Sequence, residues 1–147
     1  MEDRFENFTY LVLKTGKIIQ RIKNIEMEKY GLKAVHVMCI YHLSKHPVGL
    51  TNKEIVSLTF EDKAAISRAL TLLMEKNIVT SQDGESRNIF TLTDYGNKIA
   101  NYIDDRSMAA LKKSGLGVTD KERDEFYSTL RKIEKNIENH YQELLKK

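Results

Sequence analysis

Residues 51–79 constrain the fold of this chain more than any other segment, because their pattern predicts two short helices joined by a tight turn. Thr51 and Glu54 have the spacing of a capping box, in which each side chain accepts a hydrogen bond from a backbone N–H group at a helix start. We therefore predict that a first helix begins at Thr51 and buries its apolar residues Ile55 and Leu58.

The second helix is predicted to begin at Thr59, with Asp62 completing a weaker capping box, and to run to about Lys76. Apolar residues recur along it at helical spacing: Ile66, Ala69, Leu70, Leu73 and Met74. The opposite face carries small and hydrogen-bonding residues: Lys63, Ala64, Ser67, Arg68 and Thr71. Small side chains allow close approach to a duplex, and Arg or Ser can reach phosphates or base edges. The pattern indicates a DNA-reading helix-turn-helix, although an ordinary helical hairpin of any all-α protein would show the same two helices.

A short β-hairpin is predicted directly after the second helix. Asn77 follows the helix, and asparagine tolerates the left-handed conformation that commonly ends one. Residues 78–80 and 88–92 form two β-branched runs on either side of a polar turn that contains Asp83 and Gly84. A helix-turn-helix with such a hairpin behind it is a winged helix.

These residues resemble the multiple-antibiotic-resistance regulator (MarR) family of dimeric winged-helix transcription factors over nearly the whole chain. The order of four motifs carries the resemblance: Asp62-Lys63, Ser67-Arg68, Leu73-Met74-Glu75-Lys76-Asn77-Ile78-Val79 and Leu92-Thr93-Asp94-Tyr95-Gly96. The resemblance implies a mainly α fold with a small β-hairpin wing, in which N- and C-terminal helices form a dimerisation lobe. Within a single MarR-like domain of residues 1–147, it implies dimerisation helices at 1–31 and 116–147, a winged-helix DNA-binding lobe at 32–93 and a connecting helix at 94–115.

The chain departs from similar regulators at positions that bear on DNA recognition. They usually have Gly where this chain has Asn77, and Ser or Thr where it has Ala64 and Ala65, so an operator sequence cannot be carried over from a relative. Their wings tend to be longer and to carry an Asp-Arg-Arg cluster. Here only Arg87 matches, either as a minor-groove or phosphate contact or as a solvated turn arginine. The predicted DNA contacts are Thr51, Lys63, Ala64, Ala65, Ser67, Arg68, Thr71 and Arg87.

The resemblance implies a homodimeric repressor that binds a palindromic operator in double-stranded DNA. In proteins of this kind a small molecule in the crevice between the lobes alters the spacing of the two heads, so an effector of unknown identity could be a further partner.

The charge pattern supports an alternative. The net charge is +3, yet residues 51–76 hold four basic and four acidic residues, whose charges cancel. Because phosphate neutralisation supplies much of the affinity for DNA, a winged-helix dimer that binds a protein partner and has little DNA affinity is the competing hypothesis.

The two ends of the chain predict a homodimer. In the last helix, which Thr119 and Glu122 open with another capping box, an apolar seam approaches a heptad pattern: Phe126, Leu130, Ile133, Ile137, Tyr141 and Leu144. The first helix has a similar stripe that includes Phe5, Phe8 and Val12. Either stripe could pack within one subunit, but two long amphipathic helices are hard to bury in so small a chain. We expect a twofold dimer whose interface combines both ends, with DNA half-sites about one turn, roughly 10 base pairs, apart.

The remaining segments predict two further helices. Residues 32–45 are apolar on most sides and should form a buried central helix, which Pro47 and Gly49 end. A helix over residues 94–113 should connect the winged head to the dimer base. Its inward residues are predicted to be Ile99, Tyr102, Ile103 and Leu111.

No cofactor and no metal site are expected, and the pattern does not indicate an enzyme. His36, His42 and His46 lie close to Cys39 in the sequence, but their spacing is too common to specify a metal, and polar helix-end histidines explain it. The apolar neighbours of Cys39 favour a buried, inert thiol over a redox sensor. The sequence contains no GxSxG motif, no phosphate-binding glycine loop and no nucleophile with an evident base partner.

The composition gives no indication of export or of membrane insertion. No apolar run approaches the length of about 20 residues that a bilayer requires, and no segment resembles a signal peptide. The single cysteine fits a reducing compartment. We therefore expect a cytoplasmic protein of one domain.

Overall fold

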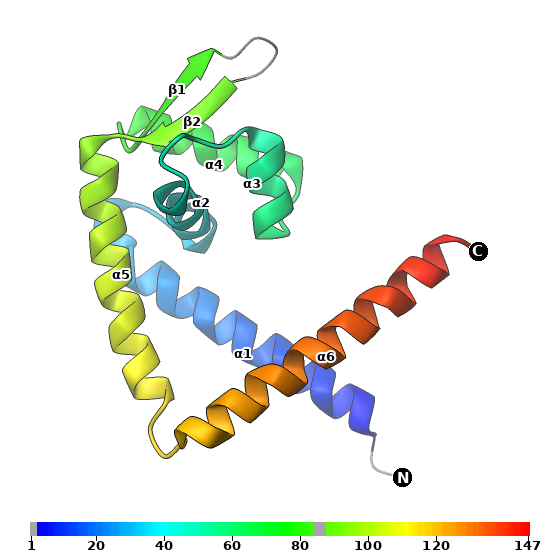
Figure 1. Ribbon diagram of the computed structural model, residues 1–147. Helices are drawn as coiled ribbons and strands as arrows, with labels where there is room; N and C mark the ends of the chain where they lie inside the picture. Colours follow the sequence, from blue (N-terminus) through cyan, green and yellow to red (C-terminus); the bar gives the residue numbers. More distant parts are fainter. Residues whose placement is uncertain (1–2, 84–87) are drawn as a thin grey trace. The chain divides into compact units, whose positions relative to one another are not determined.

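The computed structural model describes residues 3–83 and 88–147 (Figure 1). This part of the chain forms helices and one antiparallel pair of strands: α1 (Arg4–Glu26), the 3-10 helix η1 (Glu28–Tyr30), α2 (Ala34–Lys45), α3 (Asn52–Thr59), α4 (Lys63–Glu75), β1 (Val79–Asp83), β2 (Asn88–Leu92), α5 (Asp94–Ser114) and α6 (Asp120–Leu145). The chain divides into two compact units, Met1–Ser107 and Met108–Lys147, with the boundary inside α5. The elements confirm the predicted mainly α architecture with a hairpin between helices. None of the helices among the described residues is long and apolar enough to cross a membrane.

Helix α3 begins where the capping box predicts. Thr51 Oγ1 accepts a hydrogen bond from Glu54 N at 3.2 Å, and Glu54 Oε2 accepts one from Thr51 N at 3.4 Å. Ile55 is completely buried, as predicted. The predicted burial of Leu58 is wrong, because the helix ends one residue later and leaves this side chain 39% exposed. Val56 packs against the core instead.

Helix α4 begins three residues later than predicted, because Asp62 and not Thr59 caps it. Thr59 stays in the last turn of α3, where its hydroxyl donates to the carbonyl oxygen of Ile55 at 2.8 Å. Phe60 then adopts a left-handed conformation with φ 56° and reverses the chain. Asp62 Oδ1 accepts a hydrogen bond from Ala65 N at 2.7 Å. A threonine hydroxyl can bond back to a helix carbonyl, and aspartate is the stronger cap, so the start moves to Asp62.

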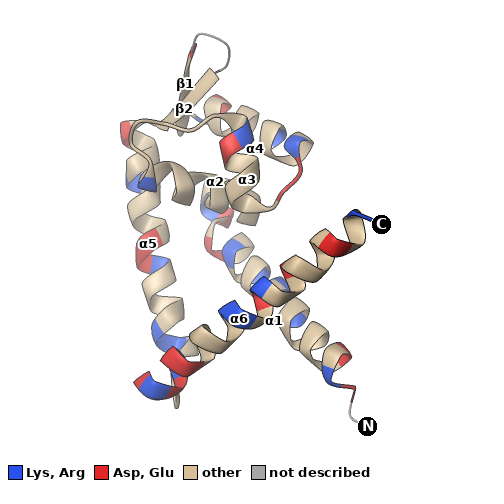
Figure 2. Cartoon of the chain, turned by 45° about the vertical axis from the view of Figure 1, so that its right-hand side comes forward, with Lys and Arg blue, Asp and Glu red and all other residues tan. Residues whose placement is uncertain are grey.

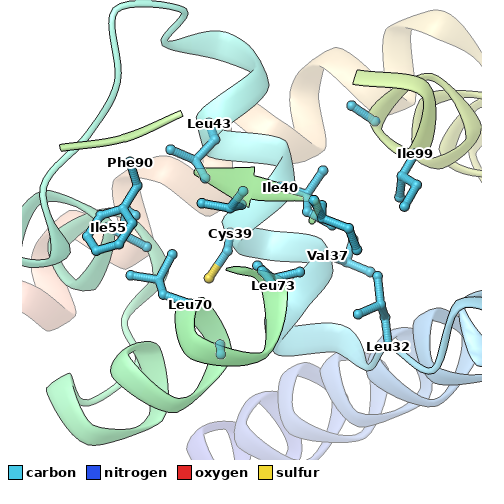
Figure 3. Close-up of a cluster of buried hydrophobic side chains, with 14 of the residues drawn as sticks. Leu32, Val37, Cys39, Ile40, Leu43, Ile55, Leu70, Leu73, Phe90 and Ile99 are labelled. Atoms are coloured by element: carbon cyan, nitrogen blue, oxygen red, sulfur yellow. The ribbon is translucent and has the colours of Figure 1, made fainter. Parts of the chain in front are cut away.

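The core of the first unit surrounds α2, which confirms the prediction of a central buried helix. Figure 3 shows Cys39, Ile40 and Leu43 of α2 among side chains from the neighbouring elements, including Ile55, Leu70, Leu73 and Phe90. Four of the five apolar residues predicted to face inward from α4 are buried. The fifth, Met74, is exposed because α4 ends at the next residue. Tyr41 is likewise exposed, on the outer side of α2.

The wing is a two-stranded hairpin tied to the loop before α3. The strands pair antiparallel from Val79 opposite Leu92 to Asp83 opposite Asn88, which confirms the predicted hairpin. Leu50 extends the ladder by one bridge. Its backbone N–H donates to the carbonyl oxygen of Phe90 at 3.0 Å, and Phe90 N donates back to the Leu50 carbonyl oxygen at 2.8 Å. The start of α3 and the root of the wing are therefore held together by backbone hydrogen bonds.

The junction between α4, the wing and α5 depends on three residues. Asn77 adopts the predicted left-handed conformation, with φ 57°. The Thr93 hydroxyl donates to the carbonyl oxygen of Asn77 at 2.7 Å and accepts a hydrogen bond from Gly96 N at 2.9 Å. Gly96 packs directly on the backbone of Ile78, where any Cβ would collide with the carbonyl oxygen. Thr93 and Gly96 therefore fix how the chain leaves the wing.

The terminal helices contribute little to the buried core of the chain. Neither α1 nor α6 contains a buried residue. The capping box predicted for α6 is present, with Thr119 N donating to Glu122 Oε2 at 2.9 Å and Glu122 N donating to Thr119 Oγ1 at 3.1 Å. Helix α5 buries Ile99 and Ile103, as predicted. The prediction that Leu111 faces inward is wrong, because this side chain is exposed.

Candidate nucleic-acid interface

Helix α4 presents the predicted outward face. The exposed residues of this face, which we call the α4 outer face, are Lys63, Ala64, Ser67, Arg68 and Thr71. Ala65, predicted as a further contact, is half-buried beside it. The small side chains leave room for a partner surface, while the cations and hydroxyls can donate hydrogen bonds to it.

Two other predicted DNA-binding residues differ from this group in position. Thr51 is only 5% exposed, and its hydroxyl accepts the capping hydrogen bond of α3. Thr51 therefore caps and orients α3, and it exposes little surface that a partner could contact. Arg87 lies outside the described residues.

Hydrogen bonds hold both hydroxyls of the α4 outer face. Asn52, the first residue of α3, donates from Nδ2 to Ser67 Oγ at 3.0 Å. One turn further along α4, the Thr71 hydroxyl donates to the backbone carbonyl oxygen of Ser67 at 2.9 Å. Sequence reasoning missed Asn52, because its contact with Ser67 spans 15 residues and depends on how α3 packs on α4.

A cavity of about 620 Å³ lies beside the start of α4. Its wall combines lysines, amides and apolar side chains from α3, α4 and β2: Thr51, Asn52, Lys53, Val56, Lys63, Asn88 and Phe90. Lys53 and Asn88 are new candidates for the interface. Only the capped start of α3 could have pointed to Lys53, because a helix start is a favourable place to bind an anion.

The acidic residues of the helix-turn-helix are largely occupied by the backbone. The carboxylates of Glu54 and Asp62 accept hydrogen bonds from helix-start N–H groups, and Glu61 is half-buried. Between Lys63 and Met74, α4 carries no acidic residue (Figure 2). All ion pairs found among the described residues lie in α6, so none neutralises Lys63 or Arg68. The charge count over residues 51–76 therefore does not describe the α4 outer face, whose two charged residues, Lys63 and Arg68, are both cations.

Cys39 and the histidines do not form a metal site in the described part of the chain. Cys39 is completely buried, and this burial, with the charge of Glu61, raises the pKa of its thiol to about 12. Burial lowers the pKa of His36, whose Nδ1 accepts a hydrogen bond from Lys33 N at 2.9 Å. His46 Nδ1 bonds to the carbonyl oxygen of His42 at 2.7 Å. Among the described residues, no group of three or more His, Cys, Asp or Glu side chains could hold a metal ion.

The residues predicted to form a dimer interface are apolar and accessible within each unit. On α1, Phe5 and Val12 are exposed and Phe8 is half-buried. On α6, Leu130 is half-buried and the other five side chains of the seam are exposed: Phe126, Ile133, Ile137, Tyr141 and Leu144. Large exposed apolar patches often mark association sites, so these side chains remain candidates for the predicted dimer interface.

The fold and this interface define a winged helix-turn-helix protein. Comparison with protein-family models gives no match, and comparison with curated proteins gives none either. Solved structures, in contrast, are similar over nearly the whole chain. The MarR protein from Peptoclostridium difficile is 20% identical with a TM-score of 0.85, and the match covers 94% of this chain and 92% of that one. The transcriptional regulator SlyA is 17% identical with a TM-score of 0.83, with coverage of 92% and 96%.

A third similar structure is that of Staphylococcus aureus MepR in complex with DNA. It is 16% identical with a TM-score of 0.80, and the match covers 88% of this chain and 96% of that one. The chain therefore has the fold of the MarR-family transcriptional regulators. This finding confirms, at the level of the fold, the resemblance seen in the sequence.

Proposed function

We propose that this protein is a sequence-specific DNA-binding transcriptional regulator that acts as a homodimer and represses transcription from a palindromic operator. The observation that carries the proposal is the α4 outer face, which displays Lys63, Ser67 and Arg68 on a helix fixed by caps and core packing. A protein of the same fold, MepR, was crystallised with DNA. In the proposed complex this face enters the major groove, Arg87 of the wing contacts DNA nearby, and Ala64 and Ala65 allow close approach.

The exposed apolar faces of α1 and α6 support the homodimeric part of the proposal. A twofold dimer would double every phosphate contact, which offsets the modest charge of one reading head. Release of the operator by a small-molecule effector rests on the likeness of fold alone.

The test is binding of the purified protein to DNA fragments from the neighbourhood of its own gene, with a scrambled competitor and several salt concentrations. Selective, salt-sensitive binding is expected for the wild type. Arg68→Glu should abolish it, because the change places a negative charge at the centre of the α4 outer face. Arg106→Glu on α5 makes the same charge change at another exposed arginine and should alter affinity by no more than about twofold at physiological salt.

A second candidate function is a winged-helix dimer that recognises a protein partner and has little DNA affinity. One observation favours it: Phe60, in the turn between α3 and α4, is 95% exposed, and the neighbouring Leu58 is also exposed. If all fragments bind equally weakly and Arg68→Glu changes nothing, this second function replaces the first. The search would then turn to proteins that co-purify with the chain and lose contact in a Phe60→Ser variant.

A further inference from the structure

We infer that Asn52 is a positioning residue that sets the hydrogen-bonding character of the α4 outer face. It leaves the Ser67 hydroxyl free to donate to DNA, whereas the helix itself turns the Thr71 hydroxyl into an acceptor. The inference rests on the proposed DNA-binding function. It goes further by stating which base edges two side chains would select.

The Asn52 amide directs its nitrogen toward Ser67 and its oxygen into the protein. Nδ2 lies 3.0 Å from Ser67 Oγ, while Oδ1 is buried without a hydrogen-bond partner among the described residues. Turning the amide over would bury two N–H donors without partners where one acceptor now lies. Because buried donors without partners are costly, the observed orientation is the better satisfied one.

The Ser67 hydroxyl keeps its proton free for a partner. A serine hydroxyl has one donor and two acceptor lone pairs, and Asn52 occupies one lone pair. No acceptor within the described residues takes the Ser67 O–H. In the middle of a helix a hydroxyl commonly donates to the carbonyl four residues back, but the contact from Asn52 holds Ser67 Oγ toward α3 instead. The proton of Ser67 is therefore available to a partner.

Thr71 has the opposite character. Its O–H is already committed to the carbonyl oxygen of Ser67 at 2.9 Å, so only lone pairs remain for a partner. In the major groove, acceptors are N7 and O6 of guanine, N7 of adenine and O4 of thymine, while donors are N6 of adenine and N4 of cytosine. Ser67 should thus favour a base with an accessible acceptor, and Thr71 a base with an amino group.

The experiment uses the full chain and a DNA sequence that the wild type selects from a random pool. Affinities for every single base-pair substitution of that sequence are measured for the wild type and for Ser67→Ala, which locates the base that Ser67 contacts. At that position the wild type should bind a base with a major-groove acceptor (guanine, adenine or thymine) about fivefold more tightly than cytosine, which is the effect of one hydrogen bond. Asn52→Asp is the decisive variant, because a carboxylate accepts the Ser67 proton and leaves only lone pairs for DNA. The preference at that base pair should vanish or move to a base with an amino group.

Asn88→Asp is the matched control. It makes the same isosteric change in a residue that lines the same cavity but, among the described residues, forms no hydrogen bond with Ser67. It should lower affinity evenly for all sequences by adding a negative charge. Asn52→Ala provides a second test. Because Asn52 acts through Ser67, the double variant Asn52→Ala/Ser67→Ala should lose less DNA affinity than the sum of the two single variants. Thermal unfolding of each variant shows whether it is folded.

Three results would overturn the inference while leaving the proposed function intact. The first is that Asn52→Asp, like Asn88→Asp, lowers the affinity equally for all DNA sequences. The second is that the affinity losses of Asn52→Ala and Ser67→Ala add in the double variant. The third is that Ser67→Ala lowers the affinity equally for every sequence. A wild type that selects no sequence at all would overturn the proposed function and the inference together.

Discussion

Cys39 shows how the environment of a single residue decides its chemistry. Its thiol is fully buried, and its pKa is raised from 9.0 to about 12, so almost no thiolate exists near neutral pH. We predict that iodoacetamide at pH 8 modifies the native protein far more slowly than the protein unfolded in urea, as measured by mass. The readout is unambiguous because the chain has one cysteine. Equal rates would show that Cys39 is accessible and restore the redox-sensor hypothesis.

The same pKa shift predicts how stability depends on alkaline pH. The unfolded chain loses the Cys39 proton near pH 9.0, whereas the folded chain keeps it until about pH 12. Between these values the folded state binds more protons, so the contribution of Cys39 to stability is intact below pH 9 and is lost as the pH rises. The free energy of unfolding should therefore fall less steeply above pH 9 in Cys39→Ala than in the wild type. Parallel curves from urea unfolding would contradict this prediction.

Phe60 combines a left-handed backbone with a fully solvated ring. Its φ is 56° and its side chain is 95% exposed, so the chain bears a conformational cost with no packing in return. We predict that Phe60→Gly raises the free energy of unfolding by roughly 0.5–1 kcal/mol, measured by urea denaturation. Phe60→Ala removes the ring but keeps the left-handed cost, and should leave stability nearly unchanged. A loss of stability in both variants would mean that the ring packs against the protein.

At the scale of elements, sequence patterns correctly predicted those helix starts and ends that depend on residues close together in the sequence. The capping boxes at Thr51 and Thr119 and the left-handed Asn77 depend on residues within one turn, and the structure contains all three. The start of α4 was misplaced because Thr59 and Asp62 are both plausible caps, and the Thr59 hydroxyl bonds back to the Ile55 carbonyl oxygen of α3, which leaves the cap of α4 to Asp62. The contacts of Asn52 with Ser67 and of Leu50 with Phe90 join residues far apart in the sequence. No spacing rule could reveal them.

The packing of α5 on the chain between α4 and β1 gives a prediction for a whole element. A Cβ on Gly96 would collide with the carbonyl oxygen of Ile78, and backbone on both sides resists movement. Gly96→Ala should cost about 3 kcal/mol or more of stability, in the range of overpacked sites with strain, because α5 or the wing must shift. Gly16→Ala is the matched control, because a Cβ there meets nothing within 4 Å. Within α1 it should stabilise by about 0.5–1 kcal/mol. Equal effects in thermal unfolding would refute the close contact.

At the scale of the whole molecule, the candidate site was only partly predictable from the sequence. The outward residues of α4 follow from helical periodicity, because a helix with one apolar face must expose the other. The distribution of charge did not follow: the count over residues 51–76 cancels, yet the structure places Glu54 and Asp62 at helix caps. Lys53 and Asn88 join the cavity beside α4 only through the folding of α3 against β2.

The apolar seam of α6 gives the prediction that tests the assembly. Ile137 is exposed in the chain although it belongs to a near-heptad stripe, so we expect a second copy to cover it. Ile137→Lys would bury a charge there and should weaken the dimer by at least about 2 kcal/mol, or roughly thirtyfold in the dissociation constant. Asn139→Lys makes a similar change on the outer side of the same helix and should leave the dimer intact.

Sedimentation equilibrium over a range of concentrations would measure both variants. DNA affinity should fall with Ile137→Lys even though the α4 outer face is untouched, because only a dimer can address two half-sites at once. A monomeric wild type, or identical behaviour of the two variants, would refute the α6 interface. If the dimer dissociates but DNA affinity does not change, each reading head binds independently, and a palindromic operator is no longer required.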